Sequence, residues 1–140
     1  MLGPVRRAIA ASLLALAVAL GCGPDVSTPR GAADHFLDMF YVAIDLPGTL
    51  PLTTGLARRK VAEEIRLTLG EGQVIDEATR RPRIYYQFLE EHPVDEHTTR
   101  FLYRAKIRTD DGEAFERRWL VTMRREEGGW LVADYEQLPS

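Results

Sequence analysis

The sequence predicts an α+β fold in which N-terminal helices pack on an antiparallel sheet. Apolar residues recur with a helical period between about residues 33 and 69, a spacing that gives a helix one apolar face. After residue 84 the apolar residues alternate with a period of two, as in strands with one buried face. Glycine-containing turns at 110–112 and 128–129 separate the alternating segments, which indicates antiparallel neighbours.

The first helix is expected from about Ala33. Thr28-Pro29 offers a cap followed by a proline in the first turn. Leu46-Pro47-Gly48 is expected to end the helix, because proline restricts the residue before it. The apolar stripe of this helix consists of Ala33, Phe36, Leu37, Phe40, Tyr41 and Ile44.

A second helix is expected from about residue 54 to 69, and Gly70 is a natural stop. Its inner face is predicted to carry Ala57, Val61, Ala62, Ile65 and Leu69. Its outer face is predicted to carry Arg58, Arg59, Lys60, Glu63 and Glu64, which we interpret as a solvated face and not as a binding patch. The pattern assigns no structure to the connector at 70–82.

Four strands are expected at about 84–89, 99–109, 115–123 and 130–138. A helix is the competing interpretation for residues 84–89. The outer face of the sheet is expected to be an ordinary solvated face, because Glu113 and Glu116 interrupt its basic residues. Those basic residues are Arg100, Arg104, Lys106, Arg108, Arg118 and Arg124.

The turn at Asp110-Asp111-Gly112 predicts the register of the second and third strands. A two-residue loop would mix the two faces of the sheet, whereas a three-residue loop with Gly112 left-handed keeps the aromatic residues together. The second register sets Tyr103 beside Trp119. It also places Arg117 on the aromatic face, opposite Ala105, where a charge needs a partner. An acid on the last strand is the favoured partner, with Asp134 and Glu136 as candidates, and an anionic ligand is the alternative.

Residues 1–21 have the features of an export signal. Arg6 and Arg7 supply a positive start, and the apolar run 8–20 follows, interrupted only by Ser12. A helix of that length reaches about 20 Å, well short of a bilayer core of about 30 Å. A permanent transmembrane helix is therefore the weaker interpretation. Cys22, which follows the signal, is the only cysteine of the chain.

The tetrad Ala19-Leu20-Gly21-Cys22 resembles the lipobox of bacterial lipoproteins, although leucine is usual at its first position. The resemblance implies cleavage before Cys22, which would then carry a diacylglycerol and an N-terminal acyl chain. The protein is expected to be exported and lipid-anchored to the bacterial cell membrane or outer membrane, with its domain on the periplasmic or extracellular side. The alternatives are an uncleaved anchor and ordinary secretion with a free thiol.

Cleavage would leave 119 residues with 16 basic and 21 acidic side chains. Residues 22–31 are interpreted as a tether rich in Gly and Pro, and residues 32–140 as one domain. An acidic surface of this kind does not favour nucleic acid as a partner. With Cys22 lipidated no disulfide can form, so stability is expected from packing alone.

The final hairpin ends in Gly128-Gly129-Trp130-Leu131-Val132-Ala133-Asp134-Tyr135. Helices followed by a sheet with this ending resemble the nuclear-transport-factor-2-like superfamily over roughly residues 32–138. The resemblance implies a cone in which helices pack into a curved antiparallel sheet around a central cavity. The residues expected at that cavity are Phe36, Phe40, Tyr86, Phe101, Tyr103, Arg117 and Trp119. The superfamily contains isomerases, dehydratases, cyclases and hydrolases together with many non-catalytic modules, so the fold leaves the function open.

Candidate catalytic groups are few. His35 and Asp38 are one helical turn apart but lie on the polar side of their helix. His92 and His97 flank Asp95 and Glu96 in what we interpret as a polar loop without a metal-ligand spacing. The sequence has no Ser or Cys nucleophile motif and no glycine-rich phosphate loop. We assign no catalytic residue, metal or cofactor.

Two hypotheses follow from the sequence. The leading one is an envelope lipoprotein whose non-catalytic domain binds a small ligand or an envelope protein. The alternative is a small enzyme of isomerase or dehydratase type that uses an acid or base in the cavity, for which Asp134, Tyr86, Tyr103 and Tyr135 are loose candidates. A cavity carboxylate close to Tyr103 or Tyr86, with a strongly perturbed pKa, would favour the enzyme. A cavity filled by aromatic residues would favour the binding role. The sequence carries no signal for an oligomeric state.

The first prediction concerns the anchor at Cys22. The intact mass of protein from its own membranes should correspond to a chain that starts at Cys22 and carries acyl chains, which hold it on the bilayer at about 0.8 kcal/mol per buried methylene. Cys22→Ser should release the protein from the membrane fraction. A Cys22→Ser protein that sediments with membranes as before would contradict lipidation.

Overall fold

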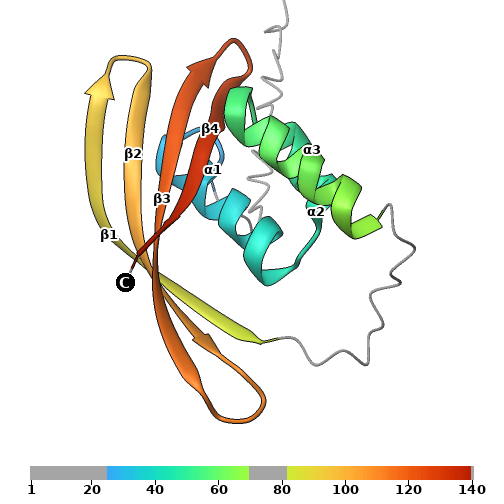
Figure 1. The fold of residues 1–140 in the computed structure, drawn as a ribbon. Helices are drawn as coiled ribbons and strands as arrows, with labels where there is room; N and C mark the ends of the chain where they lie inside the picture. The colour runs from blue at the N-terminus through green and yellow to red at the C-terminus, as the bar shows by residue number, and fades with distance from the viewer. Residues whose placement is uncertain (1–24, 70–81, 140) are drawn as a thin grey trace, which may run out of the picture.

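The computed structural model describes residues 25–69 and 82–139, so the signal at 1–21, Cys22 and the connector at 70–81 lie outside the described residues. Three α-helices lie on one face of a four-stranded antiparallel sheet with strand order β1-β2-β3-β4 (Figure 1). The sheet curves around the helices, as Figure 1 shows. The α+β architecture predicted from the two periodicities is confirmed.

Helix α1, Pro29–Leu37, begins where the sequence predicted a cap. The Thr28 side chain accepts a hydrogen bond from the Gly31 N–H, and Pro29 occupies the first turn. Ala33, Phe36 and Leu37 are fully buried against the sheet. The predicted apolar stripe therefore holds over this part of the helix.

The first helical segment does not continue regularly to Leu46. Residues Asp38–Val42 form a π-helical turn, in which the Ala43 N–H donates to the Asp38 carbonyl at 2.7 Å. Ile44 then adopts a left-handed backbone with φ of 54°, a strained conformation for a β-branched residue. Leu46-Pro47-Gly48 does not end the helix but opens the short helix α2, Leu46–Thr49, which Asp45 caps.

Helix α3, Gly55–Leu69, follows a 3₁₀ turn at Leu50–Leu52 and packs against β4. Ala57 and Val61 are buried as predicted, but Ala62 is exposed. Successive residues of an α-helix are offset by about 100° around its axis. Because Val61 faces the core, Ala62 points away from β4. Lys60, predicted to lie on the solvated face, instead turns towards β4.

The segment before α3 is attached to the edge of β4. Thr53 forms a parallel bridge with Val132, and the Thr54 N–H donates to the Val132 carbonyl at 2.8 Å. Thr53 is buried, and its hydroxyl donates to the Leu50 carbonyl. These contacts satisfy backbone groups at the edge of the sheet that would otherwise be open to another strand.

The structure has the four expected strands, and the first of them is longer than the sequence predicted. They are β1 Arg83–Asp95, β2 Thr98–Arg108, β3 Ala114–Glu126 and β4 Gly129–Leu138. His92 and Asp95 belong to β1 and not to the polar loop expected from the sequence, and only the turn at Glu96-His97 separates β1 from β2. Bulges after Phe88 and Pro93 allow β1 to remain paired through this stretch despite Pro93.

The predicted register of β2 and β3 is confirmed. The Thr109 N–H donates to the Glu113 carbonyl at 2.9 Å around the three-residue loop, and Gly112 is left-handed with φ of 89°. Tyr103 lies opposite Trp119, Ala105 opposite Arg117, and Lys106 opposite Glu116. The helix-facing side of β2 and β3 therefore carries a continuous aromatic and aliphatic surface.

Large side chains fill the space between the sheet and the helices. Phe36, Phe101, Tyr103 and Trp119 are each at most 1% exposed. The Tyr41 ring stacks on Trp119 with 3.9 Å between ring centroids. Among the described residues, no helix is long and apolar enough to cross a membrane, and no group of three potential metal ligands occurs.

The fold predicts that the domain depends on Trp119. Trp119→Ala should lower the free energy of unfolding by about 3–5 kcal/mol, because it leaves a cavity at the centre of the core. Phe115→Ala is the control, since Phe115 lies on the same strand and face but is 37% exposed. Urea unfolding should show a small loss for Phe115→Ala, and a chelator should not unfold the protein. Equal losses for both variants would contradict this packing.

Candidate functional site

An open groove lies between α3 and the C-terminal half of β4. Its volume is about 1000 Å³. Helix α3 supplies one wall, β4 supplies the other, and the π-helical turn supplies the aromatic end. The lining residues are Phe40, Tyr41, Arg59, Lys60, Glu63, Glu64, Tyr135, Glu136, Gln137 and Leu138. The charged face of α3 that we interpreted as solvated therefore forms one wall of this groove.

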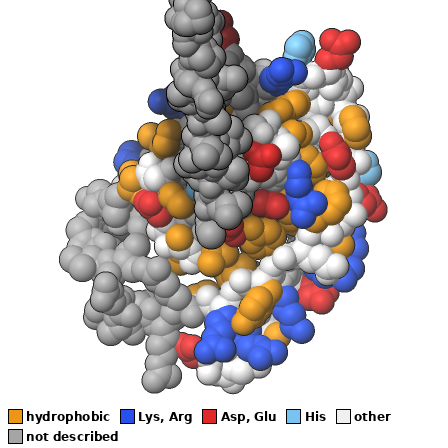
Figure 2. Space-filling model, turned by 180° about the vertical axis from the view of Figure 1, so that it is seen from behind, with side chains coloured by type: hydrophobic (Ala, Val, Ile, Leu, Met, Phe, Trp, Pro, Cys, Tyr) orange, Lys and Arg blue, Asp and Glu red, His pale blue; other side chains and the backbone are white. Residues whose placement is uncertain are grey.

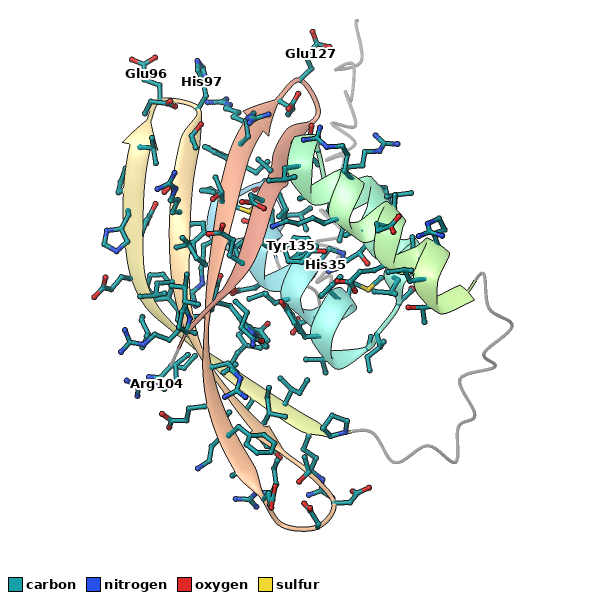
Figure 3. All side chains as sticks on the ribbon, viewed as in Figure 1. His35, Glu96, His97, Arg104, Glu127 and Tyr135 are labelled. Atoms are coloured by element: carbon teal, nitrogen blue, oxygen red, sulfur yellow. The ribbon has the colours of Figure 1, made fainter. Side chains whose placement is uncertain are left out.

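Tyr135 lines the groove and carries a buried hydroxyl. Its ring points from β4 towards the helices (Figure 3) and packs against Phe36 and Phe40, with centroid separations of 5.2 and 4.9 Å. The residue is only 8% exposed. Its hydroxyl oxygen is buried, and no described residue forms a hydrogen bond with it. A buried polar atom without a partner costs stability, so this hydroxyl requires an explanation.

Tyr41 and Glu64 complete a polar cluster around Tyr135. The Glu64 side chain remains largely exposed, and partial loss of water around its carboxyl raises its pKa. Burial and the nearby Glu64 charge raise the pKa of the Tyr41 phenol. The pKa of Tyr135 is also raised, first by burial and then by the charge of Glu64. Both phenols are therefore protonated near neutral pH and available as hydrogen-bond donors.

Lys60 closes one side of the groove. Its Nζ donates to Asp134 Oδ1 at 2.7 Å and to the Tyr135 carbonyl at 2.9 Å. The same ammonium lies 5.3 Å from the centroid of the Tyr135 ring. Asp134 also accepts a hydrogen bond from the Tyr135 N–H. These contacts fix α3 to β4 and hold the Tyr135 ring in place.

A second set of tyrosine–carboxylate contacts lies between α1 and the sheet. The Tyr103 hydroxyl donates to Asp34 Oδ1 at 2.7 Å, and the Tyr86 hydroxyl donates to Asp38 Oδ1 at 2.5 Å. Burial, followed by the hydrogen bond to the carboxylate, raises the pKa of each phenol. Asp38, which we placed on a solvated helix face, thus has a specific partner. Because both hydroxyls are satisfied, this set fastens α1 to the sheet.

The seven residues predicted to surround a central cavity lie in four different places. Phe36, Phe101, Tyr103 and Trp119 belong to the filled core. Phe40 reaches the groove between α3 and β4, and Tyr86 borders a small hollow near Arg104 and Lys106. Arg117 lies at the far end of β3, beside Arg104 and Arg118.

The internal ion pair predicted for Arg117 is corrected by the structure. Its guanidinium donates to the carbonyl of neighbouring Glu116 at 2.9 Å. Asp134, one of the two predicted partners, instead pairs with Lys60. Glu136 lines the groove by α3, whereas Arg117 borders a separate hollow.

Sequence reasoning missed Glu64 as a site residue and gave Tyr41 only a packing role. Both lie on helices, and a helical pattern does not reveal which polar residue will face the edge strand β4. Tyr135 appeared only as a loose catalytic candidate. The one available signal was its position in the final hairpin, whose register the sequence leaves open and the structure sets with Tyr135 opposite Val121.

The comparisons with known proteins support the fold. No protein family matches the sequence, and no curated protein matches it. A chain from Thiobacillus denitrificans, assigned to a calcium/calmodulin-dependent protein kinase type II association domain, has 21% identity and a TM-score of 0.62, over 84% of this chain and 98% of that one. A nuclear-transport-factor-2-like protein of unknown function from Shewanella oneidensis has 6% identity and a TM-score of 0.55, over 79% and 98%.

A ketosteroid isomerase-like protein from Erwinia carotovora atroseptica is a third similar structure. It has 17% identity and a TM-score of 0.51, over 80% of this chain and 93% of that one. At these identities the likeness concerns the fold alone. The chain has a nuclear-transport-factor-2-like α+β fold, with helices packed on a curved antiparallel sheet.

The surroundings of Glu63 and Glu64 predict that pH affects their contributions to the stability of the fold in opposite directions. Burial raises the native pKa of Glu64, so the folded protein binds this proton more tightly than the unfolded chain does. The resulting contribution to the free energy of unfolding is fully present below the unfolded pKa and is lost as pH rises through the native pKa. The hydrogen bond from Arg66 lowers the native pKa of Glu63. Its stabilising contribution is present above the unfolded pKa and is lost as pH falls through the native one.

Urea unfolding of Glu64→Gln and Glu63→Gln across the acidic range measures these effects. Relative to the parent, Glu64→Gln should gain stability as pH rises past the ordinary pKa of glutamate. Glu63→Gln should lose stability over the same rise. The same sign of change for both variants would contradict the described surroundings of Glu64.

Proposed function

We propose that this protein is a lipid-anchored protein of the bacterial envelope whose domain binds a small ligand in the groove between α3 and β4 without transforming it. The anchor is inferred from the signal and Cys22 in the sequence. The binding role rests above all on Tyr135, which lines the groove and whose buried hydroxyl has no partner among the described residues. Such a group is stabilised when a ligand provides its missing hydrogen bond.

The filled interior supports the choice of this groove. Trp119, Phe101 and Phe36 are packed in the core, where the family resemblance implies a central cavity. The groove has the size of known small-molecule sites and combines an aromatic floor with a few polar groups. The likeness to the ketosteroid isomerase-like protein is one of fold, and we do not extend that activity to this chain.

The proposed ligand has an apolar body and a hydrogen-bond acceptor. The apolar part would lie against Phe40 and Leu138, and the acceptor would receive the hydroxyl hydrogens of Tyr41 and Tyr135. A carbonyl, ether or hydroxyl oxygen meets this requirement. Lys60 is held by Asp134, so its charge is already compensated before a ligand arrives.

The second candidate function is an acid/base enzyme acting in the same groove. The raised pKa of Glu64, close to two protonated phenols, is the observation that favours it. An enzyme of this kind would exchange a hydrogen of its ligand with solvent. Incubation of the copurified ligand with the protein in deuterated water distinguishes the two functions, since a binding protein returns the ligand without deuterium. Exchange that stops in Glu64→Gln would replace the binding proposal with the enzyme.

Native mass spectrometry of protein purified from its own membranes tests the binding proposal. The parent should carry a small-molecule adduct, and Tyr135→Phe should lose most of it while the free energy of unfolding stays equal or rises by up to about 3 kcal/mol. Tyr103→Phe is the matched control, because its hydroxyl already donates to Asp34. This variant should keep the adduct and lose about 1–3 kcal/mol of stability.

Three results would contradict the proposal: no adduct in the parent, an adduct that survives Tyr135→Phe, or equal loss of the adduct in Tyr103→Phe. An adduct with the mass of a protein that is lost in Tyr135→Phe would assign the groove to an envelope protein as partner.

A further inference from the structure

A second hollow, separate from the groove, lies where β4 ends. Leu138 is the last residue of β4, and its partner in β3 is Arg118. The β3 residues before Arg118 therefore have no neighbour on that side among the described strands. A hollow of about 390 Å³ opens at this step in the sheet, lined by Arg104, Glu116, Arg117, Arg118 and Pro139. Figure 3 shows Arg104 on the outer side of the sheet, close to the end of β4.

Like charges face each other across this hollow. Arg104 and Arg118 are direct cross-strand partners in β2 and β3, an arrangement that destabilises a sheet when nothing compensates it. No described residue forms an ion pair with either arginine. Lys and Arg side chains gather near the β2–β3 hairpin at the same end of the molecule (Figure 2).

Arg117 adds a third guanidinium from the other side of β3. It is half-buried, and among the described residues its guanidinium forms a hydrogen bond with the Glu116 carbonyl. Its guanidinium carbon lies 5.6 Å from the centroid of the Phe115 ring, a contact that leaves most of its donors free. Glu116 is the one acid of the hollow, and it lies opposite Lys106 in the sheet. The hollow thus has three cations and one anion.

We propose that this hollow binds a phosphoryl group. A guanidinium presents its donors in a planar fork that matches phosphate oxygens. A phosphoryl group offers enough oxygens for the three arginines, which approach from both faces of β3, whereas a carboxylate has only two. The bound anion would also remove the repulsion between Arg104 and Arg118. The phosphoryl group can belong to a phospholipid headgroup or to a soluble phosphorylated compound.

The test measures binding to the full chain in neutral detergent, with the Nε–Hε NMR signals of its arginines as the readout. Inorganic phosphate is titrated at constant ionic strength, with chloride as the compensating anion. Saturable shifts of the Arg104 and Arg118 signals are expected. Arg104→Gln and Arg118→Gln should each weaken binding at least about tenfold, the amount that loss of a charge-assisted hydrogen bond implies. Arg118→Lys should retain only part of the parent's affinity for phosphate, because lysine lacks the planar fork of donors that a guanidinium has.

Arg100→Gln is the matched control. Arg100 lies on the same face of β2, opposite Thr122 and outside the hollow, so this variant should bind phosphate as the parent does. Arg118→Gln should also be at least as stable as the parent in urea, since it removes a like-charge pair. Equal weakening in Arg100→Gln, or absence of saturable binding to the parent, would overturn the proposal.

Two further titrations identify the source of the phosphoryl group. Dihexanoyl phosphatidylglycerol presents an accessible anionic phosphate, and dihexanoyl phosphatidylcholine presents the same phosphate beside a cation. Tighter binding of the glycerol lipid than of inorganic phosphate, dependent on Arg118, assigns the hollow to an anionic headgroup. Tighter binding of inorganic phosphate assigns it to a soluble compound. If both lipids bind equally well in the presence and absence of inorganic phosphate, and still bind to Arg104→Gln, the result would contradict the site.

Discussion

The register between β2 and β3 is the constraint on which the rest of the structure depends. The three-residue loop with left-handed Gly112 places Tyr103 beside Trp119 on the helix-facing side. A shift by one residue would turn every side chain of one strand to the other face. The core that receives Phe36 would then be lost, and the hydroxyl of Tyr103 would no longer reach Asp34 on α1.

The same register also determines where open space remains beside the core. Because Trp119 and its neighbours fill the concave face, the groove lies at the margin, between α3 and β4. The bridge from Thr53 to Val132 and the ion pair from Lys60 to Asp134 hold α3 at that margin. Tyr135 links both regions, since its ring belongs to the core while its hydroxyl lies unpartnered at the groove.

The sequence predicted what local periodicity and turn chemistry control. The cap at Thr28, the burial of Val61 and the position of Arg117 opposite Ala105 all follow from such rules. It did not predict the π-helical turn or the strained Ile44, because both depend on tertiary packing that overrides a local preference. The groove was missed for the same reason. Lys60 and Glu64 carry a solvated pattern, and only the docking of α3 on β4 reveals their neighbours.

The central claim is that the domain binds its ligand at the margin and keeps its interior filled. A crystal structure of protein purified from its own membranes, with its ligand retained, tests this claim most directly. We expect a ligand between α3 and β4 with an acceptor atom within hydrogen-bond distance of the Tyr135 hydroxyl, and Trp119 still stacked on Tyr41. A ligand found between the sheet and α1, with Trp119 displaced, would contradict it.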